Sequence, residues 1–226
     1  MRVGSPHDPA GSGSSASATR AQTRVYGERV DELVTQLRLE IGAPATPAGS
    51  AALVVLMGYP GVGKSHCARL LAARLGAAHV ASDQLRSRLF IAPTYATAEN
   101  ETIFKCMDAL VEGLLRERHR VIVDATNLVA RYRASSVAAA MRMSAPITFV
   151  RVVADEAAIR GRLARRREAR SADDHSDADE RVYERMRDRP FEAPEEGYVE
   201  LRNGDGLAAA IEELAVAVEQ RCASAI

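Results

Sequence analysis

Residues Gly58 to Ser65 have types and spacing that suit the binding of phosphate. They fit the pattern G-x-x-x-x-G-K-[ST], in which glycines let backbone N–H groups converge on an anion. Lys64 is one of only two lysines in a chain that otherwise uses arginine for its basic side chains. A lysine ammonium on a flexible stem reaches phosphate as a compact charge. The alternative is a tight turn followed by a helix cap.

The flanking residues provide the context that a phosphate-binding loop needs. Residues 52–57 are an apolar run suited to a buried strand, and apolar residues recur at helical spacing within 64–75. A helix N-terminus adds the positive end of its dipole. We therefore expect a nucleoside triphosphate, ATP, to bind here. The expected binding residues are Gly58, Tyr59, Pro60, Gly61, Val62, Gly63, Lys64, Ser65 and His66.

Asp83 and Arg86 follow a second predicted strand, residues 78–82. They lie three residues apart, which places them on one face of a predicted helix, 83–89. The carboxylate there could take the proton of an acceptor hydroxyl, and the arginine could hold an anionic group of the acceptor. The alternative is a helix-capping Asp and an exposed Arg.

Asp124 ends a third predicted strand, residues 120–124, after three β-branched residues. This is the form of a strand whose Asp orients Mg²⁺ or its water shell, while the Ser65 hydroxyl is a direct ligand. The alternative is a helix-capping role for Asp124 or Asn127, because a helix is predicted from about residue 130. Arg131 and Arg133, near the start of that helix, are expected to face an acceptor pocket.

An arginine cluster follows the fourth predicted strand, residues 147–153. Its members are Arg160, Arg162, Arg165, Arg166, Arg167 and Arg170. One interpretation is a lid, about residues 160–180, whose arginines neutralise charge on the transferred phosphoryl group and exclude water. The other is a solvated helix that pairs with the acidic stretch after it. After the fifth predicted strand, 198–202, a turn with Asn203 could hold an adenine edge, or be a simple turn.

Alternating strands and helices predict an α/β fold. We expect three layers, with a parallel sheet of about five strands covered by helices on both faces and an Arg-rich lid. Ligands then gather at the carboxyl ends of the strands. The predicted helices after the loop are 64–75, 83–89, 98–117, 130–143, 155–168, 177–187 and 206–221.

The 226 residues predict one such domain, 51–226, preceded by two appendages. Residues 1–23 are rich in Gly, Ser, Ala and Pro and are expected to be disordered. Residues 24–50 hold an amphipathic helix, about 25–41, and a linker. That helix either packs on the core, which is the simpler arrangement, or joins two subunits of a homo-oligomer.

Composition narrows the classes of partner. The formal net charge is zero, so there is no overall attraction to nucleic acid or anionic membranes.

The three cysteines are widely spaced and are expected to be buried thiols. The five histidines have no metal-ligand spacing. No apolar stretch suits a membrane span or a secretory signal, so we expect a cytoplasmic protein.

Four motifs together resemble the small AAA-type P-loop kinases, a group that includes the 5′-kinase domain of bacteriophage polynucleotide kinase and zeta-toxin-like proteins. The motifs are Gly58 to Ser65, Asp83-x-x-Arg86, Asp124 to Asn127 and Arg162-x-x-x-Arg166, and the resemblance covers about residues 52–222.

This resemblance implies roles for the same residues. Lys64 and Ser65 would bind the phosphates and Mg²⁺, Asp83 would be the general base, and Arg86 would meet the acceptor's phosphate. Asp124 would support the metal or Arg86. Arg166 would be the lid arginine, with Arg162 as a second candidate.

The function expected is transfer of the γ-phosphate of ATP to a hydroxyl, most like a polynucleotide 5′-hydroxyl kinase. A small-molecule kinase acting on a nucleoside, sugar or antibiotic is the alternative, because the chain is neutral and lacks an aromatic stacking platform. A non-kinase ATPase or nucleotide switch is a second alternative. Ala125, where many ATPases have Glu, and the absence of an Asn-Lys-x-Asp guanine signature argue against it.

Overall fold

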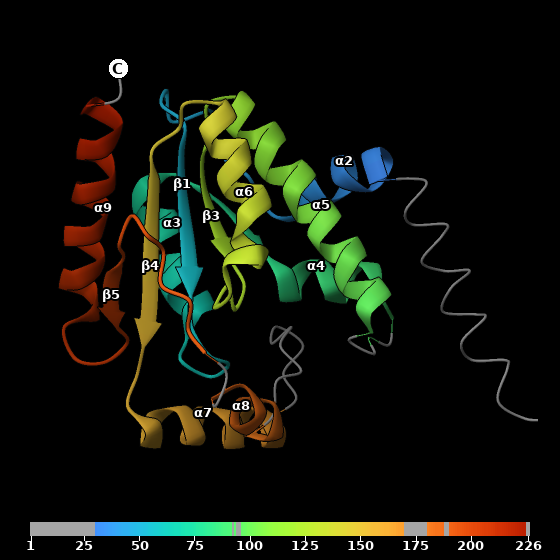
Figure 1. The fold of residues 1–226 in the computed structure, drawn as a ribbon, viewed down its shortest axis with the longest axis vertical. Coiled ribbons are helices and arrows are strands. Elements are labelled where there is room, and N and C mark those ends of the chain that lie inside the picture. Colours follow the sequence, from blue (N-terminus) through green and yellow to red (C-terminus); the bar gives the residue numbers. More distant parts are fainter. Residues whose placement is uncertain (1–29, 92, 94–95, 170–179, 188–189, 225–226) are drawn as a thin grey trace, which may run out of the picture.

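The structure is a computed structural model that describes residues 30–91, 93, 96–169, 180–187 and 190–224 (Figure 1). Its five strands form one sheet in the order β2-β3-β1-β4-β5, and every neighbouring pair is parallel. The strands are β1 (Ala52–Met57), β2 (Ala78–Ala81), β3 (Arg120–Asp124), β4 (Ile147–Val153) and β5 (Val199–Arg202).

Helices cover both faces of this sheet (Figure 1). They are α2 (Val30–Glu40), α3 (Lys64–Leu75), α4 (Ser82–Leu89), α5 (Thr97–Arg116), α6 (Ala130–Arg142), α7 (Glu156–Ala169), α8 (Glu180–Arg187) and α9 (Leu207–Ser224). The predicted three-layer α/β fold with a five-stranded parallel sheet is confirmed. The predicted element boundaries lie within three residues of the observed ones wherever those residues are described.

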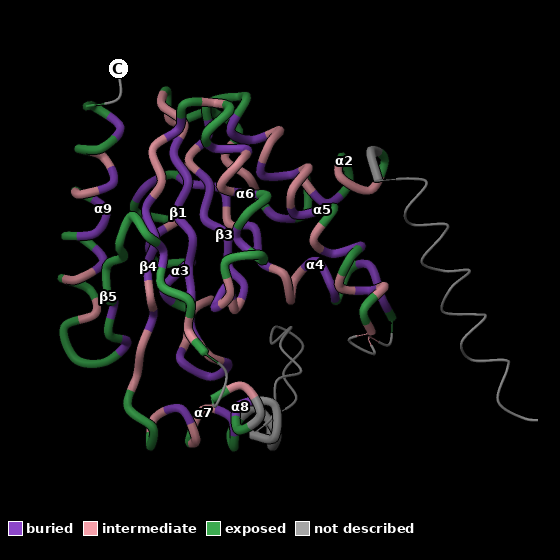
Figure 2. Tube along the Cα trace, viewed as in Figure 1, coloured by how far each residue is buried: buried purple, intermediate pink, exposed green. Residues whose placement is uncertain are grey.

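The central strand β1 divides the core into two clusters. Its side chains alternate between the faces, with Leu53, Val55 and Met57 in one cluster and Ala52, Val54 and Leu56 in the other. All six are buried, as the apolar run requires (Figure 2). Helices α2, α4, α5 and α6 contribute to the first cluster, and α3, α7, α8 and α9 to the second. Both faces of the central strand β1 are therefore closed to solvent.

The N-terminal helix α2 packs on the first cluster. Leu37 and Ile41 are buried there, and Leu33 and Val34 lie against it. A double hydrogen bond from the Arg38 guanidinium to the Glu117 carboxylate ties α2 to the end of α5. Of the two expected arrangements, packing on the core is therefore the one seen. Residues 1–23, predicted to be disordered, and the first turn of the predicted helix lie outside the described residues, and the predicted domain boundaries stay a prediction.

The strand order places the loop after β1 at a switch point. From β1 the sheet continues through β3 and β2 on one side and through β4 and β5 on the other. A crevice forms at such a point outside the carboxyl ends of the strands, and ligands of this fold class bind there. Helices α7 and α8 lie beyond these carboxyl ends (Figure 1). None of the described helices is long and apolar enough to cross a membrane.

Candidate functional site

The loop from Gly58 to Gly63 is shaped so that two of its glycines are required. Gly58 has φ 153°, and a Cβ there would lie 2.7 Å from the backbone oxygen of Val152. Gly63 has φ 92° and caps the N-terminus of α3, and its Cβ would lie 1.9 Å from Asn203 Nδ2. Since contacts below 3.0 Å force neighbouring atoms to move, the loop keeps this close approach only with glycine.

Lys64 begins α3, and its Nζ donates to the backbone oxygen of Tyr59 at 3.0 Å. The ammonium therefore lies over the loop whose N–H groups are expected to bind phosphate. Pro60, Gly61 and Val62 are buried within the loop, whereas His66 is exposed one residue after Ser65. The buried thiol of Cys67 packs beneath the first turn of α3. Burial raises the pKa of Cys67 to about 11.

Asp124 lies at the carboxyl end of β3 and is only 4% exposed. Its Oδ2 accepts a hydrogen bond from His79 Nε2 at 3.1 Å, and its carboxylate accepts a further one from the Ser65 hydroxyl. Burial alone raises the pKa of Asp124, but the His79 hydrogen bond and charge, the Lys64 charge and the Ser65 hydroxyl outweigh it, so that this pKa lies below its ordinary value. Asp124 is thus an ionised carboxylate directly beside Ser65.

The alternative role for Asp124 or Asn127 as a helix cap is wrong. Helix α6 begins at Ala130, and its N-cap is Val129, without a side-chain capping bond. Asn127 instead has φ 48° and donates from Nδ2 to the backbone oxygen of Leu56 at 2.9 Å. It therefore ties the segment after β3 to β1, next to the phosphate loop.

The expectation that Arg133 faces an acceptor pocket is also wrong. Its guanidinium is buried, and it donates to the backbone oxygens of Asn127 at 2.6 Å and of Glu192 at 2.7 Å. Burial lowers the pKa of Arg133, against the attraction of Glu192 and Glu196. Arg133 therefore holds two loops together.

Asp83 and Arg86 lie on α4, directly after the edge strand β2. Asp83 is half-buried in the first turn, and Arg86 is 6% exposed. Arg86 Nη2 donates to Asn100 Oδ1 at 2.6 Å, and Nη1 lies 3.5 Å from Glu99 Oε2 on α5. The alternative of a capping Asp and an exposed Arg is wrong, because the N-cap of α4 is Ala81 and the arginine is buried. A role of Arg86 toward an acceptor stays a prediction.

Arg162 and Asn203 both contact the phosphate loop. Arg162 Nη1 donates to the backbone oxygen of Val62 at 3.2 Å, and Nη2 donates to that of Asn203 at 3.3 Å. Asn203 Nδ2 donates to the same Val62 oxygen at 2.8 Å. On the same helix as Arg162, Ile159 and Leu163 pack so closely on Gly61 that a Cβ there would lie 2.9 and 3.0 Å from them. The predicted lid helix and the predicted adenine turn thus meet at this loop.

The other arginines of the cluster either face solvent or lie outside the described residues. Arg160 pairs with Glu156 at 2.9 Å and lies 3.6 Å from Glu184, so it is ion-paired in solvent, although these partners are not in the acidic stretch that was expected to pair with it. Arg165 is exposed and bonds only within its own helix among the contacts described. The side chain of Arg166 and residues 170–179 of the predicted lid lie outside the described residues.

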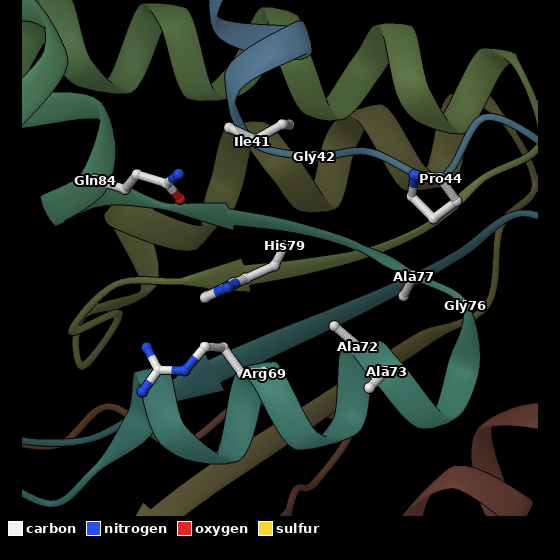
Figure 3. A pocket seen from close by; sticks show the side chains of 10 residues that line it. All are labelled: Ile41, Gly42, Pro44, Arg69, Ala72, Ala73, Gly76, Ala77, His79 and Gln84. Carbon is white, nitrogen blue, oxygen red and sulfur yellow. The ribbon is translucent and has the colours of Figure 1, made fainter. Parts of the chain in front are cut away.

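His79 belongs to this arrangement, and sequence reasoning missed it. Its spacing from the other histidines carries no signal, and its contact with Asp124 spans 45 residues of sequence. The available signal was a polar residue within an otherwise apolar strand, Ala78–Ala81. The imidazole also lines a cavity of about 480 Å³ between α3, β2 and the segment after α2 (Figure 3).

The donors at Ser65 and Asp124 fit Mg²⁺. Both are oxygen ligands, and the ionised carboxylate is hydrogen-bonded to the hydroxyl. No group of three or more His, Cys, Asp or Glu side chains in the described part of the chain could hold a metal ion by itself. A magnesium ion here would thus take its other ligands from phosphate and water, as Mg²⁺ usually does.

Comparisons with known proteins agree with this arrangement. Residues 53–194 match the AAA domain family. The fold is similar to APS kinase CysC of Mycobacterium tuberculosis, solved with AMPPNP and APS, at 18% identity and a TM-score of 0.56 over 77% of this chain and 99% of that one. Kti12 of Chaetomium thermophilum, solved with ADP-AlF3, has 20% identity and a TM-score of 0.61 over 75% and 98% of the two chains.

A gluconokinase of Sinorhizobium meliloti has 16% identity and a TM-score of 0.52 over 79% of this chain and 97% of that one. A search of curated proteins by sequence gives no match. The family match covers more than half of the chain, and the structural likeness extends over nearly the whole of each similar protein. The chain therefore belongs to the AAA domain family, and its fold is that of the P-loop kinases.

Proposed function

We propose that this protein is an ATP-dependent phosphotransferase that moves the γ-phosphoryl group of ATP to a hydroxyl acceptor. The observation that carries the proposal is the separation of two carboxylates at one edge of the sheet. Asp124 is buried beside Ser65 and near Lys64, and we assign it to the part of the site that binds the phosphates. Asp83 follows the neighbouring strand and belongs to a different helix, and we assign this second carboxylate to the acceptor. AMPPNP and ADP-AlF3 in the similar structures support ATP as the donor nucleotide.

The chemistry divides among these groups as follows. Backbone N–H groups of the loop bind the phosphates, and Lys64 exchanges the Tyr59 oxygen for a phosphate oxygen. Asp83 accepts the proton of the acceptor hydroxyl, whose oxygen forms a bond to the γ-phosphorus as the bond to the bridging oxygen of ADP breaks. Ser65, with the Asp124 carboxylate hydrogen-bonded to it, would hold Mg²⁺, which would supply positive charge against the phosphates. Arg162 exchanges loop carbonyls for phosphate oxygens as the lid closes, and Asn203 borders the nucleotide.

We propose a 5′-hydroxyl end of a polynucleotide as the acceptor, on the strength of the Asp83-x-x-Arg86 and Asp124 to Asn127 motifs. A small-molecule acceptor is the second candidate. The observation in its favour is that Arg86 already has Asn100 and Glu99 as close partners, so less of its charge is left for a phosphate of a nucleic acid. The two candidates differ in how transfer should depend on salt.

A transfer screen with [γ-³²P]ATP separates these candidates. We expect label to appear on 5′-hydroxyl oligonucleotides, with an apparent KM that rises steeply between low and physiological salt because counterions must be displaced. Label on nucleosides or sugars with little salt dependence favours the small-molecule kinase. Rapid ATP hydrolysis without any acceptor, and no labelled acceptor, contradicts the kinase assignment and favours an ATPase or switch.

Replacing Arg162 with Ala should lower kcat/KM for ATP by about 10- to 100-fold, since a hydrogen bond to a charged group is worth about 1.5–3 kcal/mol. Arg165→Ala is the matched control, because it removes the same charge from an exposed position three residues along the helix. Steady-state kinetics of both variants make the comparison. Equal losses in both would assign the effect to the net charge of the helix and not to the contact with the loop.

A further inference from the structure

The buried carboxylate of Asp124 has a partner on the neighbouring strand. In the parallel register of β2 and β3, Ala81 lies opposite Asp124, and His79 is two residues earlier on the same face. The imidazole therefore reaches Asp124 diagonally, with Nε2 3.1 Å from Oδ2. An ionised carboxylate only accepts hydrogen bonds, so Nε2 must be the donor.

We propose that His79 is a positioning residue that holds the Asp124 carboxylate beside the Ser65 hydroxyl, in the orientation in which the pair receives Mg²⁺ with the nucleotide. The inference rests on the proposed function, because it assigns a task within the same site. His79 itself touches neither the phosphates nor the acceptor in this proposal. It acts only through Asp124.

The surroundings of Asp124 show why such a partner is needed. The carboxylate lies at the end of an apolar strand and is 4% exposed, so bulk solvent has little access to it. Ser65 belongs to the loop end of α3, which must also respond to the phosphates. His79 belongs to the sheet, which is the rigid layer between two apolar clusters. Loss of an outer partner of a metal-binding group typically lowers metal affinity by about 10- to 100-fold.

The other side of the imidazole can be reached from solvent. His79 lines the cavity at the β2 edge, together with Arg69 and Gln84 and a wall of small residues that includes Ala77 (Figure 3). A volume of about 480 Å³ is ample for a free imidazole molecule. Removal of the His79 side chain should therefore leave a gap that added imidazole enters to restore the lost hydrogen bond.

The test measures binding of a fluorescent ADP analogue with Mg²⁺ and with EDTA. His79→Ala should weaken binding about tenfold in Mg²⁺ and leave it unchanged in EDTA. Imidazole should recover part of the loss in this variant and have no effect on the wild type. His79→Gln should keep most of the affinity, because its amide nitrogen can donate from a similar position. Wild-type affinity of His79→Ala in Mg²⁺, or an equal loss in Mg²⁺ and EDTA, would overturn the proposal.

Arg69→Ala is the matched control. It removes another polar side chain from the same cavity, from the exposed face of α3, and should bind the Mg²⁺ nucleotide within about twofold of the wild type and gain nothing from imidazole. A loss as large as that of His79→Ala would show that the cavity wall matters and the contact with Asp124 does not.

A second measurement needs no nucleotide. The shift in the midpoint of thermal unfolding caused by His79→Ala should be clearly smaller when Asp124 is already Ala, because neighbours that interact are not additive. Equal shifts in both backgrounds would overturn the proposal. A wild type that binds no Mg²⁺ nucleotide would reject the proposed function alone, since this coupling is measured independently of it.

Discussion

Replacing Asp83 with Asn is expected to lower the rate of phosphoryl transfer by about 10²- to 10⁴-fold, which is the usual contribution of a general base. The amide has nearly the shape of the carboxylate but cannot accept the proton of the acceptor hydroxyl. Asp83 lies in the first turn of α4, away from the phosphate loop in sequence and on a different helix from Lys64 and Ser65. The affinity for ATP should therefore stay almost unchanged. Single-turnover transfer and equilibrium binding of ATP measure the two quantities separately.

Glu213→Gln is a suitable control for Asp83→Asn. It makes the same chemical change at an exposed position of α9 and should leave both quantities at the wild-type level. Retained transfer in Asp83→Asn would reject Asp83 as the base. A large fall in ATP affinity would instead show that Asp83 contributes to ATP binding.

The parts of the site that follow from local sequence were predictable. Glycine at 58 and 63 is demanded by positive φ and by Cβ positions that neighbouring atoms already occupy. The apolar run 52–57 fits a strand that is buried on both faces, and that strand leads directly into the loop. Loop, strand and following helix are contiguous in the chain, so a short pattern is enough to define them.

The contacts between distant segments were not predictable in the same way. Arg86 pairs with Asn100 and Glu99, and His79 pairs with Asp124, because the fold brings α4 to α5 and β2 to β3. A pattern such as D-x-x-R shows that an arginine is present. The direction in which the Arg86 side chain points depends on α5, a helix that begins eleven residues later. From its charge alone, Arg86 was expected to hold an anionic group of the acceptor. The structure shows that its buried guanidinium also lies beside the Glu99 carboxylate.

The choice among the lid arginines also depends on packing. The side of α7 that carries Ile159 and Leu163 packs on Gly61, and this fixes the rotation of the helix. Arg162 then bonds to the loop, and Arg165 remains in solvent. The sequence shows six arginines with similar surroundings, so it could indicate a lid without identifying the member that touches the loop.

Lys64→Ala is expected to lower kcat for transfer by about 10²- to 10³-fold, as the loss of one preorganised donor to a developing charge usually does. The ammonium already lies over the loop, 3.0 Å from the Tyr59 oxygen, so little movement separates this position from a phosphate. The chain offers a matched control in its other lysine, Lys105, which is exposed on α5 and should be replaceable by Ala without effect. Transfer kinetics at saturating ATP measure the loss. A Lys64→Ala variant as active as Lys105→Ala would contradict both a catalytic role of the phosphate loop and the proposed phosphoryl transfer.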